Sequence, residues 1–219
     1  MNTALLLIAT GEKYWPYAKP MIDSAKQFFV PHETILFTDC PESLGADFRA
    51  YQKNSGFPET TLKRYHTFLG LRDVLEHDFS YLFYIDIDAI FVRPVGEEIF
   101  SGGITATLHH NKNWRALLED NPRSTAYTES VQNYYCGGFN GGTSSAYLEM
   151  AGAIAAAVDE DEDRGIIAKW HDESHLNKYL AIHPPTKILT SDYCYPEPEL
   201  DKPNQAKIVC LDKSLRGGR

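Results

Sequence analysis

Two aspartates separated by one residue, Asp86 and Asp88, directly follow an apolar run that ends at Ile85. The run Tyr81–Ile85 predicts a buried strand, and open α/β sheets bind ligands at the carboxyl ends of their strands. Carboxylate oxygens are the ligands that Mg²⁺ and Mn²⁺ prefer. In a regular strand both side chains would share one face and could reach one ion. The alternative is an ordinary aspartate-rich turn.

A second group of polar side chains lies in Trp170–His175, which reads Trp-His-Asp-Glu-Ser-His. The spacing of His171 and His175 suggests zinc, but Asp172 stands where the metalloprotease motif requires glutamate. A helix N-terminus is the other interpretation, because acidic residues there complement the helix dipole. In a cleft, Asp172 and Glu173 would offer carboxylates that stabilise an oxocarbenium-like centre or act as nucleophile.

Adjacent glycines occur in Tyr134–Gly142, which reads Tyr-Tyr-Cys-Gly-Gly-Phe-Asn-Gly-Gly. Such pairs indicate a turn, a bulge, or a backbone that passes close to a bulky ligand. The chain ends in a basic tail, whose charges are either solvated or folded over a diphosphate: Lys207, Lys213, Arg216 and Arg219.

Apolar runs predict the strands that must position these groups. Ala4–Ala9, Thr34–Thr38 and Tyr81–Ile85 are expected to be strands, the first and third fully buried. Helical spacing predicts a helix over Tyr14–Phe29 and one long amphipathic helix over Thr60–Leu75. The alternation predicts an α/β fold on a mostly parallel sheet.

In the second half of the chain, helices are predicted over Tyr147–Val158 and His171–Ala181, the latter stopped by Pro184-Pro185. Two strands are predicted over Lys187–Thr190 and Lys207–Leu211. The acidic run Asp159–Asp163 is interpreted as a solvated surface loop.

Composition narrows the classes of function. The chain has 219 residues, 43% of them hydrophobic, which favours one globular domain with a real core. A net charge of -9 with no dense basic stripe argues against nucleic acid as a partner. Four scattered cysteines fit free thiols better than a disulfide scaffold. The apolar run near the start is too short to span a membrane.

Placed in chain order, these blocks resemble family 6 glycosyltransferases, the family of the histo-blood-group A and B transferases and α-1,3-galactosyltransferase. The blocks are Lys13-Tyr14, Phe37-Thr38-Asp39, Asp86-x-Asp88, the glycine-rich segment and Trp170–Tyr179. The resemblance implies a GT-A glycosyltransferase fold, α/β with a Rossmann-like nucleotide-binding half and a mixed central sheet. It also implies one catalytic domain over 1–219, with a donor half at roughly 1–95, an acceptor half at roughly 96–205 and a basic tail at 206–219.

The activity implied by the resemblance is metal-dependent, retaining transfer of GalNAc or Gal from a UDP-sugar, in α-1,3 linkage, to a galactose-containing glycan. Asp86 and Asp88 match the family's metal pair, for Mn²⁺ or Mg²⁺, and Glu173 matches its candidate nucleophile. Arg216 or Arg219 could assist at the diphosphate. The other residues that match donor-binding positions are Ala9, Tyr14, Arg64, Cys136, Gly137, Gly138, His171, Asp172 and Lys213, and His109, Trp170 and Glu173 match acceptor-binding positions.

Two positions bear on the donor and two on the acceptor. Glycine at 137 and 138 leaves room beside the C2 substituent and favours UDP-GalNAc over UDP-Gal. Leu117 and Pro196 depart from the family at acceptor-contacting positions, so a fucosylated, a plain and a lipid-linked galactoside all stay open. Without the animal enzymes' membrane anchor, the chain is expected to be a soluble, cytoplasmic protein of bacterial or phage origin.

Two other classes of function are compatible with some of these residues. A phosphatase of the haloacid dehalogenase type also has Asp-x-Asp after an apolar strand, but usually after the first one, and here two predicted strands precede it. A sugar-binding module that has lost catalysis would not need Asp86, Asp88 and Glu173 together.

Overall fold

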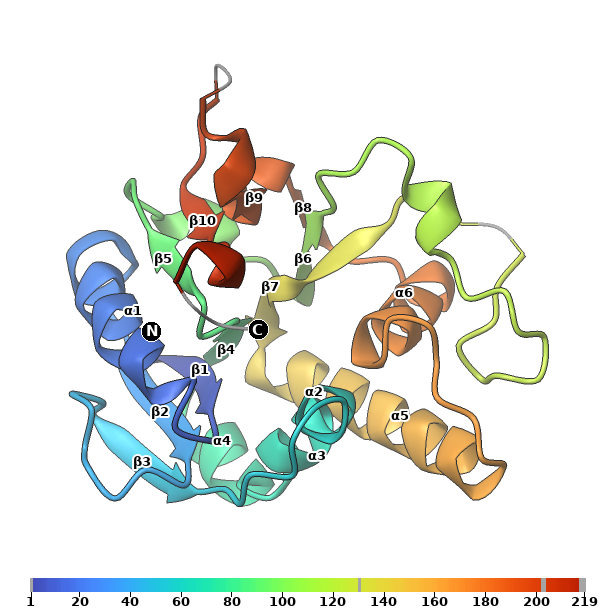
Figure 1. The fold of residues 1–219 in the computed structure, drawn as a ribbon, viewed down its shortest axis with the longest axis horizontal. Helices are drawn as coiled ribbons and strands as arrows, with labels where there is room; N and C mark the ends of the chain where they lie inside the picture. The colour runs from blue at the N-terminus through green and yellow to red at the C-terminus, as the bar shows by residue number, and fades with distance from the viewer. Residues whose placement is uncertain (1, 130, 202–203, 217–219) are drawn as a thin grey trace.

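The computed structural model describes residues 2–129, 131–201 and 204–216. Its centre is a seven-stranded sheet with the order β3-β2-β1-β4-β7-β6-β8 (Figure 1). β1 is parallel to β2 and β4, whereas β7 runs antiparallel to β4 and β6, so the sheet is mixed. The strands are β1 Thr3–Ala9, β2 Glu33–Thr38, β3 Phe48–Tyr51, β4 Tyr81–Ile85, β6 Ile104–Leu108, β7 Tyr135–Thr143 and β8 Lys187–Leu189.

A second, three-stranded sheet has the order β5-β10-β9 and lies beside the first. It consists of β5 Ala89–Phe91, β9 Tyr195–Pro196 and β10 Ile208–Cys210. β10 is antiparallel to β5, which follows β4 after a short turn. The last described strand is thereby brought back to β5, which directly follows the two aspartates.

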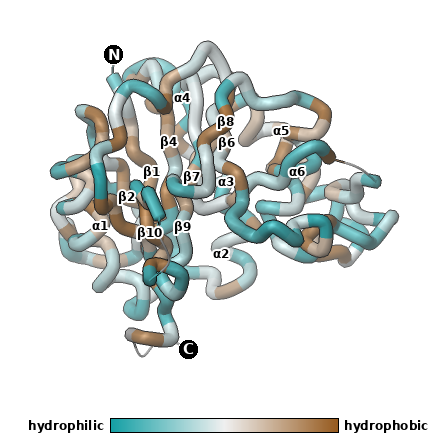
Figure 2. The backbone as a smooth tube through the Cα atoms, turned by 90° about the horizontal axis from the view of Figure 1, so that it is seen from above, coloured by the Kyte–Doolittle hydropathy of each residue, from teal (hydrophilic) through white to brown (hydrophobic). Residues whose placement is uncertain are grey.

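Helices cover both faces of the central sheet. The side chains of β1 alternate, and Leu5 and Leu7 pack with α1 while Leu6 and Ile8 pack with α3 and α5. Figure 2 shows the apolar residues of the central strands enclosed between these layers. The helices are α1 Trp15–Phe28, α2 Glu59–Leu62, α3 Arg64–Leu69, α4 Arg72–Asp78, α5 Ser144–Asp163 and α6 Asp172–Ile182, and the short 3₁₀ turns are η1 Glu97–Ile99, η2 Trp114–Leu117, η3 Ser191–Tyr193, η4 Glu197–Glu199 and η5 Lys213–Arg216.

The predicted α/β fold is confirmed, and so are the helices at α1 and α6. The single long helix over Thr60–Leu75 is wrong, because the backbone leaves the helical region at Lys63 and at Leu71. Gly70, a weak helix former, stands at the second break. The predicted apolar face is nevertheless buried, since the side chains of Tyr65 and Phe68, which lie in α3 between the two breaks, pack against the sheet.

The acidic run Asp159–Asp163 is not a loop but the last turn of α5. Asp161 is only 1% exposed, and its carboxylate accepts hydrogen bonds from the Ser124 hydroxyl at 2.5 Å and the Thr125 N–H at 2.7 Å. These hydrogen bonds compensate for the burial of the Asp161 carboxylate. They also attach the connection between β6 and β7 to α5.

The glycine-rich segment is the buried strand β7 rather than a turn. Close approach explains its glycines, since a Cβ on Gly141 or Gly142 would collide with the ring of Phe83 or the carbonyl of Gly103. All four cysteines are free thiols, as predicted. Within the described part of the chain, no helix is long and apolar enough to cross a membrane.

Candidate active site

A cavity of about 550 Å³, a size typical of small-molecule sites, opens at the carboxyl ends of β1 and β4. Its wall combines the loop after β1, the segment around α2, the turn after β4 and the chain near η5. Five predicted donor-site residues line it together: Tyr14, Arg64, Asp86, Asp88 and Lys213. Residues some 200 positions apart in the sequence therefore meet in one cavity.

Asp86 and Asp88 lie in a turn, because β4 ends at Ile85. The regular strand on which a shared face depends is therefore absent at these two residues, although both side chains line the cavity. Asp86 Oδ1 accepts a hydrogen bond from the Tyr84 hydroxyl at 2.5 Å, and Asp88 Oδ2 lies 2.6 Å from Lys213 Nζ. Burial, and next the neighbouring charge of Asp86, raise the pKa of Asp88.

The residues present fit a divalent cation of the Mg²⁺ or Mn²⁺ type. Two carboxylates that repel one another at a cavity wall offer hard oxygen ligands for such an ion. Among the described residues, no group of three or more His, Cys, Asp or Glu side chains is arranged to hold a metal. The remaining ligands would have to come from the bound substrate and water, as is usual where Mg²⁺ is bound with substrate phosphates.

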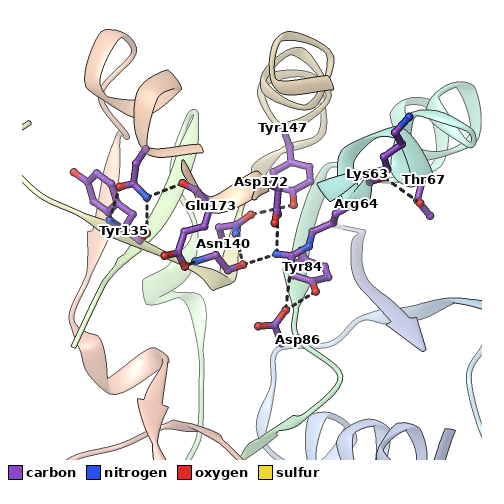
Figure 3. Close-up of polar contacts among 12 residues, drawn as sticks. Lys63, Arg64, Thr67, Tyr84, Asp86, Tyr135, Asn140, Tyr147, Asp172 and Glu173 are labelled. Carbon is purple, nitrogen blue, oxygen red and sulfur yellow. Dashed lines mark hydrogen bonds and ion pairs between the residues drawn. The ribbon is translucent and has the colours of Figure 1, made fainter. Parts of the chain in front are cut away.

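Arg64, the first residue of α3, contacts the turn after β4, the strand β7 and the start of α6 (Figure 3). It is 7% exposed, and its guanidinium lies 3.4 Å from Asp86 Oδ1 and 3.2 Å from Asp172 Oδ2. It also donates to the Gly137 carbonyl at 3.0 Å and lies over the Tyr84 ring. Although burial opposes its charge, Asp172 first and then Tyr84 and Asp86 hold the pKa of Arg64 above its ordinary value.

Asp172 and Glu173 open α6, which confirms the helix N-terminus interpretation of their block. Burial raises the pKa of Asp172 to about 6 and that of Glu173 to about 7. For Glu173, hydrogen bonds from the Gly137 N–H and the Tyr134 hydroxyl act in the opposite direction. Glu173 therefore exchanges its proton near neutral pH.

The zinc interpretation of His171 and His175 is wrong. His171 precedes the helix with a φ of 52°, a left-handed conformation that is uncommon outside glycine, so it does not share a helical face with His175. His175 is buried and faces Thr125 and Asp161 instead. The His171 ring contacts Phe57, a residue of the cavity wall, with 4.9 Å between ring centroids.

Gly137 and Gly138 lie in β7, next to these carboxylates. A Cβ on Gly137 would lie 3.3 Å from Glu173 Oε2, and one on Gly138 would lie 3.0 Å from both Asp86 Oδ2 and Cys194 Sγ. The bare backbone thus leaves room for the site's own side chains. Cys136, just before them, is buried in the same strand.

The loop after β1 is fixed from β2. Asp39 Oδ1 accepts hydrogen bonds from the Gly11 N–H at 2.8 Å and the Trp15 indole at 2.9 Å. This places the Tyr14 ring at the cavity, with Lys213 Nζ 5.6 Å from its centre. Ala9 is fully buried between Ile8 and Thr10, which both line the cavity, and its carbonyl accepts a hydrogen bond from the Thr38 hydroxyl.

The predicted acceptor residues lie on the side of Glu173. His109 follows β6, and its ring packs against the edge of Tyr134, which donates to Glu173. Burial, and next the charge of His110, lower the pKa of His109 to about 4, so it is neutral at physiological pH. Trp170 is 44% exposed beside His171.

The other positions named from the sequence are spread around the site. Leu117 ends η2, and Pro196 ends β9. Arg216 is the last residue of η5, and Arg219 lies outside the described residues.

Sequence reasoning missed four residues that hold the site together: Asp39, Tyr84, Tyr134 and Asn177. Asn177, on α6, binds both the N–H and the carbonyl of Tyr135 at 2.7 and 2.8 Å. Three of them lie inside the blocks that carry the family resemblance, but spacing alone did not separate them from their neighbours. Their role became visible only through contacts between distant segments.

A mixed α/β sheet, with an Asp-x-Asp turn at a cavity beside the carboxyl ends of its strands, has the architecture of a GT-A glycosyltransferase. The model of Glycosyltransferase family 6 matches residues 51–215, so the chain belongs to this family.

Curated relatives agree with this assignment. The rat "Histo-blood group ABO system transferase 1" is 32% identical over 94% of this chain and 65% of its own length. The human "Globoside alpha-1,3-N-acetylgalactosaminyltransferase 1" is 26% identical, over 98% of this chain and 67% of that protein. The Escherichia coli "O-antigen biosynthesis glycosyltransferase WbnI" is 28% identical, over 95% of this chain and 94% of its own. The chain thus spans about two thirds of the animal relatives and nearly all of the bacterial one.

Proposed function

We propose that this protein transfers GalNAc or Gal from a UDP-sugar to a galactose-containing glycan, with a divalent cation and with retention at the anomeric carbon. One observation carries the proposal: Arg64 joins the Asp-x-Asp turn of the cavity to the acidic start of α6 through Asp86 and Asp172. A nucleotide diphosphate bound at the turn would thus present its sugar to Glu173. Membership of the family, whose relatives named above are glycosyltransferases, supports the reaction class.

At the nucleotide end, Tyr14 would stack on the uracil while the backbone of Gly11–Tyr14 contacts the nucleoside. Asp86 and Asp88 would hold Mn²⁺ or Mg²⁺, which supplies charge neutralisation for the departing diphosphate. Lys213, now paired with Asp88, is placed to exchange that partner for a phosphate oxygen.

At the sugar end, Asp172 and Arg64 offer a buried acceptor and donor for the hydroxyls of the transferred hexose. Glu173 in its anionic form would stabilise the positive charge that develops at the anomeric carbon, or attack that carbon. Either role requires the deprotonated carboxylate. Since burial raises the pKa of Glu173 to about 7, we expect turnover to fall as pH drops below that value.

For the donor, we propose a preference for GalNAc over Gal, without exclusion of Gal. Glycine at 138 keeps the strand free of bulk where a Cβ would already touch Asp86 and Cys194. The names of the relatives include both an N-acetylgalactosaminyltransferase and a galactosyltransferase. The α-1,3 linkage is proposed on the same basis, since both names specify it.

For the acceptor, we propose that His109 and Trp170 bind a galactoside next to Glu173. A neutral His109 can hydrogen-bond a sugar hydroxyl, and the exposed Trp170 ring offers an apolar face for a sugar ring. Plain, fucosylated and lipid-linked galactosides compared in one screen would show which form is bound.

The proposal is tested by incubating the protein with Mn²⁺, a galactoside, and UDP-GalNAc or UDP-Gal. We expect UDP release and a glycosylated product, both lowered by at least about 100-fold in Glu173→Gln, while UDP binding is retained. Glu149→Gln, on the exposed side of α5, is the control and should match the wild type. Phosphate release without UDP would point to a phosphatase, and binding without turnover to a sugar-binding module.

A further inference from the structure

Both carboxylate oxygens of Glu173 are held by donors from the same short segment. Oε2 accepts a hydrogen bond from the Gly137 N–H at 2.7 Å, and Oε1 accepts one from the Tyr134 hydroxyl at 2.9 Å. One donor is a backbone N–H, which most substitutions leave in place. The other is a side chain that the proposed chemistry has not used.

Tyr134 is itself rigidly placed. It is 1% exposed, its carbonyl accepts a hydrogen bond from the His109 N–H at 2.9 Å, and the two rings meet edge to face. The next residue, Tyr135, is bound on both sides of its backbone by Asn177, which also donates to the Glu173 carbonyl at 2.9 Å. The start of β7 and the helix α6 are therefore held in a fixed position relative to one another at Tyr135, next to Tyr134.

The protonation states favour one direction of donation. Burial, and next the charge of Glu173, raise the pKa of Tyr134, so its phenol stays protonated and donates. Hydrogen bonds to a carboxylate stabilise its charged form. The charges that act against this form at Glu173 are Asp172 and Asp86, and the guanidinium of Arg64 lies between those two.

We propose that Tyr134 is a positioning residue, which orients Glu173 as an anion toward the transferred sugar and connects it to the acceptor side of the site through His109. The inference rests on the proposed glycosyl transfer. It assigns to Tyr134 no contact with substrate, because its hydroxyl is already engaged by Glu173.

The test compares Tyr134→Phe with Tyr135→Phe. The second variant is a matched control, because it removes a hydroxyl from the neighbouring tyrosine, whose hydroxyl contacts Asn133 at 3.4 Å instead of Glu173. We expect Tyr134→Phe to lower kcat about 10- to 100-fold, the usual worth of a hydrogen bond to a charged group. The KM for the UDP-sugar should change less than about threefold, because the nucleotide cavity is untouched.

The dependence of kcat on pH distinguishes a positioning role of Tyr134 from a general destabilisation of the site. Without the hydroxyl, the pKa of Glu173 rises further, so the acidic limb of the kcat profile should move to higher pH in Tyr134→Phe but not in Tyr135→Phe. In a Glu173→Gln background, Tyr134→Phe should have little additional effect, since the tyrosine acts through that carboxylate. Retained UDP binding, measured by calorimetry, shows that each variant is folded.

The inference is overturned if Tyr134→Phe binds UDP and matches Tyr135→Phe in both kcat and acidic limb. It is also overturned if the effects of Tyr134→Phe and Glu173→Gln on kcat are additive in free energy. A wild-type protein that transfers no sugar from either donor would instead refute the proposed function, so the two failures are distinguishable.

Discussion

At the scale of single residues, the site depends on buried charges that neutralise one another. Arg64 contacts both the Asp-x-Asp turn and the acidic start of α6. Buried ion pairs of this kind add little net stability, but removing one partner leaves the others unpaired in a low-dielectric interior. Arg64 should therefore matter for both folding and turnover.

We expect Arg64→Met to lower the free energy of unfolding by about 3–5 kcal/mol and kcat/KM by at least about 100-fold. Arg72→Met is the matched control, because Arg72 pairs with Glu76 on the surface, where such pairs contribute at most about 1 kcal/mol. Urea unfolding and steady-state kinetics measure the two effects. Equal stability and equal activity of both variants would contradict the role assigned to Arg64.

At the scale of elements, the site is formed by segments that are tethered to one another by buried polar contacts. Asp39 fixes the loop after β1, Asn177 fixes the start of β7, and Asp161 fixes the long connection between β6 and β7. Asp161, Ser124 and Thr125 are not among the residues that line the cavity. The tether at Asp161 therefore tests whether the connection that begins at His109 is held in place from α5.

Asp161→Ala should lower the free energy of unfolding by about 2–4 kcal/mol, because the buried donors of Ser124 and Thr125 lose their acceptor. We also expect a higher KM for the acceptor, with the KM for the UDP-sugar unchanged. Asp159→Ala, two residues earlier at an exposed position that pairs with His66, is the control. If Asp161→Ala is as stable as Asp159→Ala, the tether has no structural importance.

The elements also show what the sequence could predict. Continuous apolar runs identified β1, β2 and β4, because burial on both faces leaves a strong local signal. The breaks at Lys63 and Leu71, the helical state of Asp159–Asp163 and the burial of Asp161 were missed because long-range contacts overrule local preference there. β7 was missed because its glycines imitate a turn, while their cause, the side chain of Phe83, lies on another strand.

For the site, the sequence segments that resemble family 6 identified the charged residues, but not the residues that hold these charged side chains in place. Asp86, Asp88, Arg64, Asp172 and Glu173 were all named in advance, and the structure brings them together. Tyr134 and Asn177 were not named, since a tyrosine and an asparagine have many ordinary roles and only three-dimensional contacts distinguish them.

At the scale of the whole molecule, the cavity joins the two ends of the chain. β10 lies between β5 and β9, the Leu211 N–H donates to the Asp88 carbonyl at 2.7 Å, and Lys213 reaches the Asp88 side chain. Lys213 is therefore part of the wall that faces Tyr14. In the proposed function, donor, cation and acceptor meet at this cavity. The stereochemistry of the product therefore tests whether all three are bound as proposed.

The most direct test is to identify the product formed from UDP-GalNAc and a galactoside, with Mn²⁺ and, separately, with excess EDTA. We expect an α-linked GalNAc product, identified by the NMR coupling of its anomeric proton, which forms with Mn²⁺ and is lost with EDTA. A β-linked product, or transfer that continues unchanged in EDTA, would contradict the proposed function.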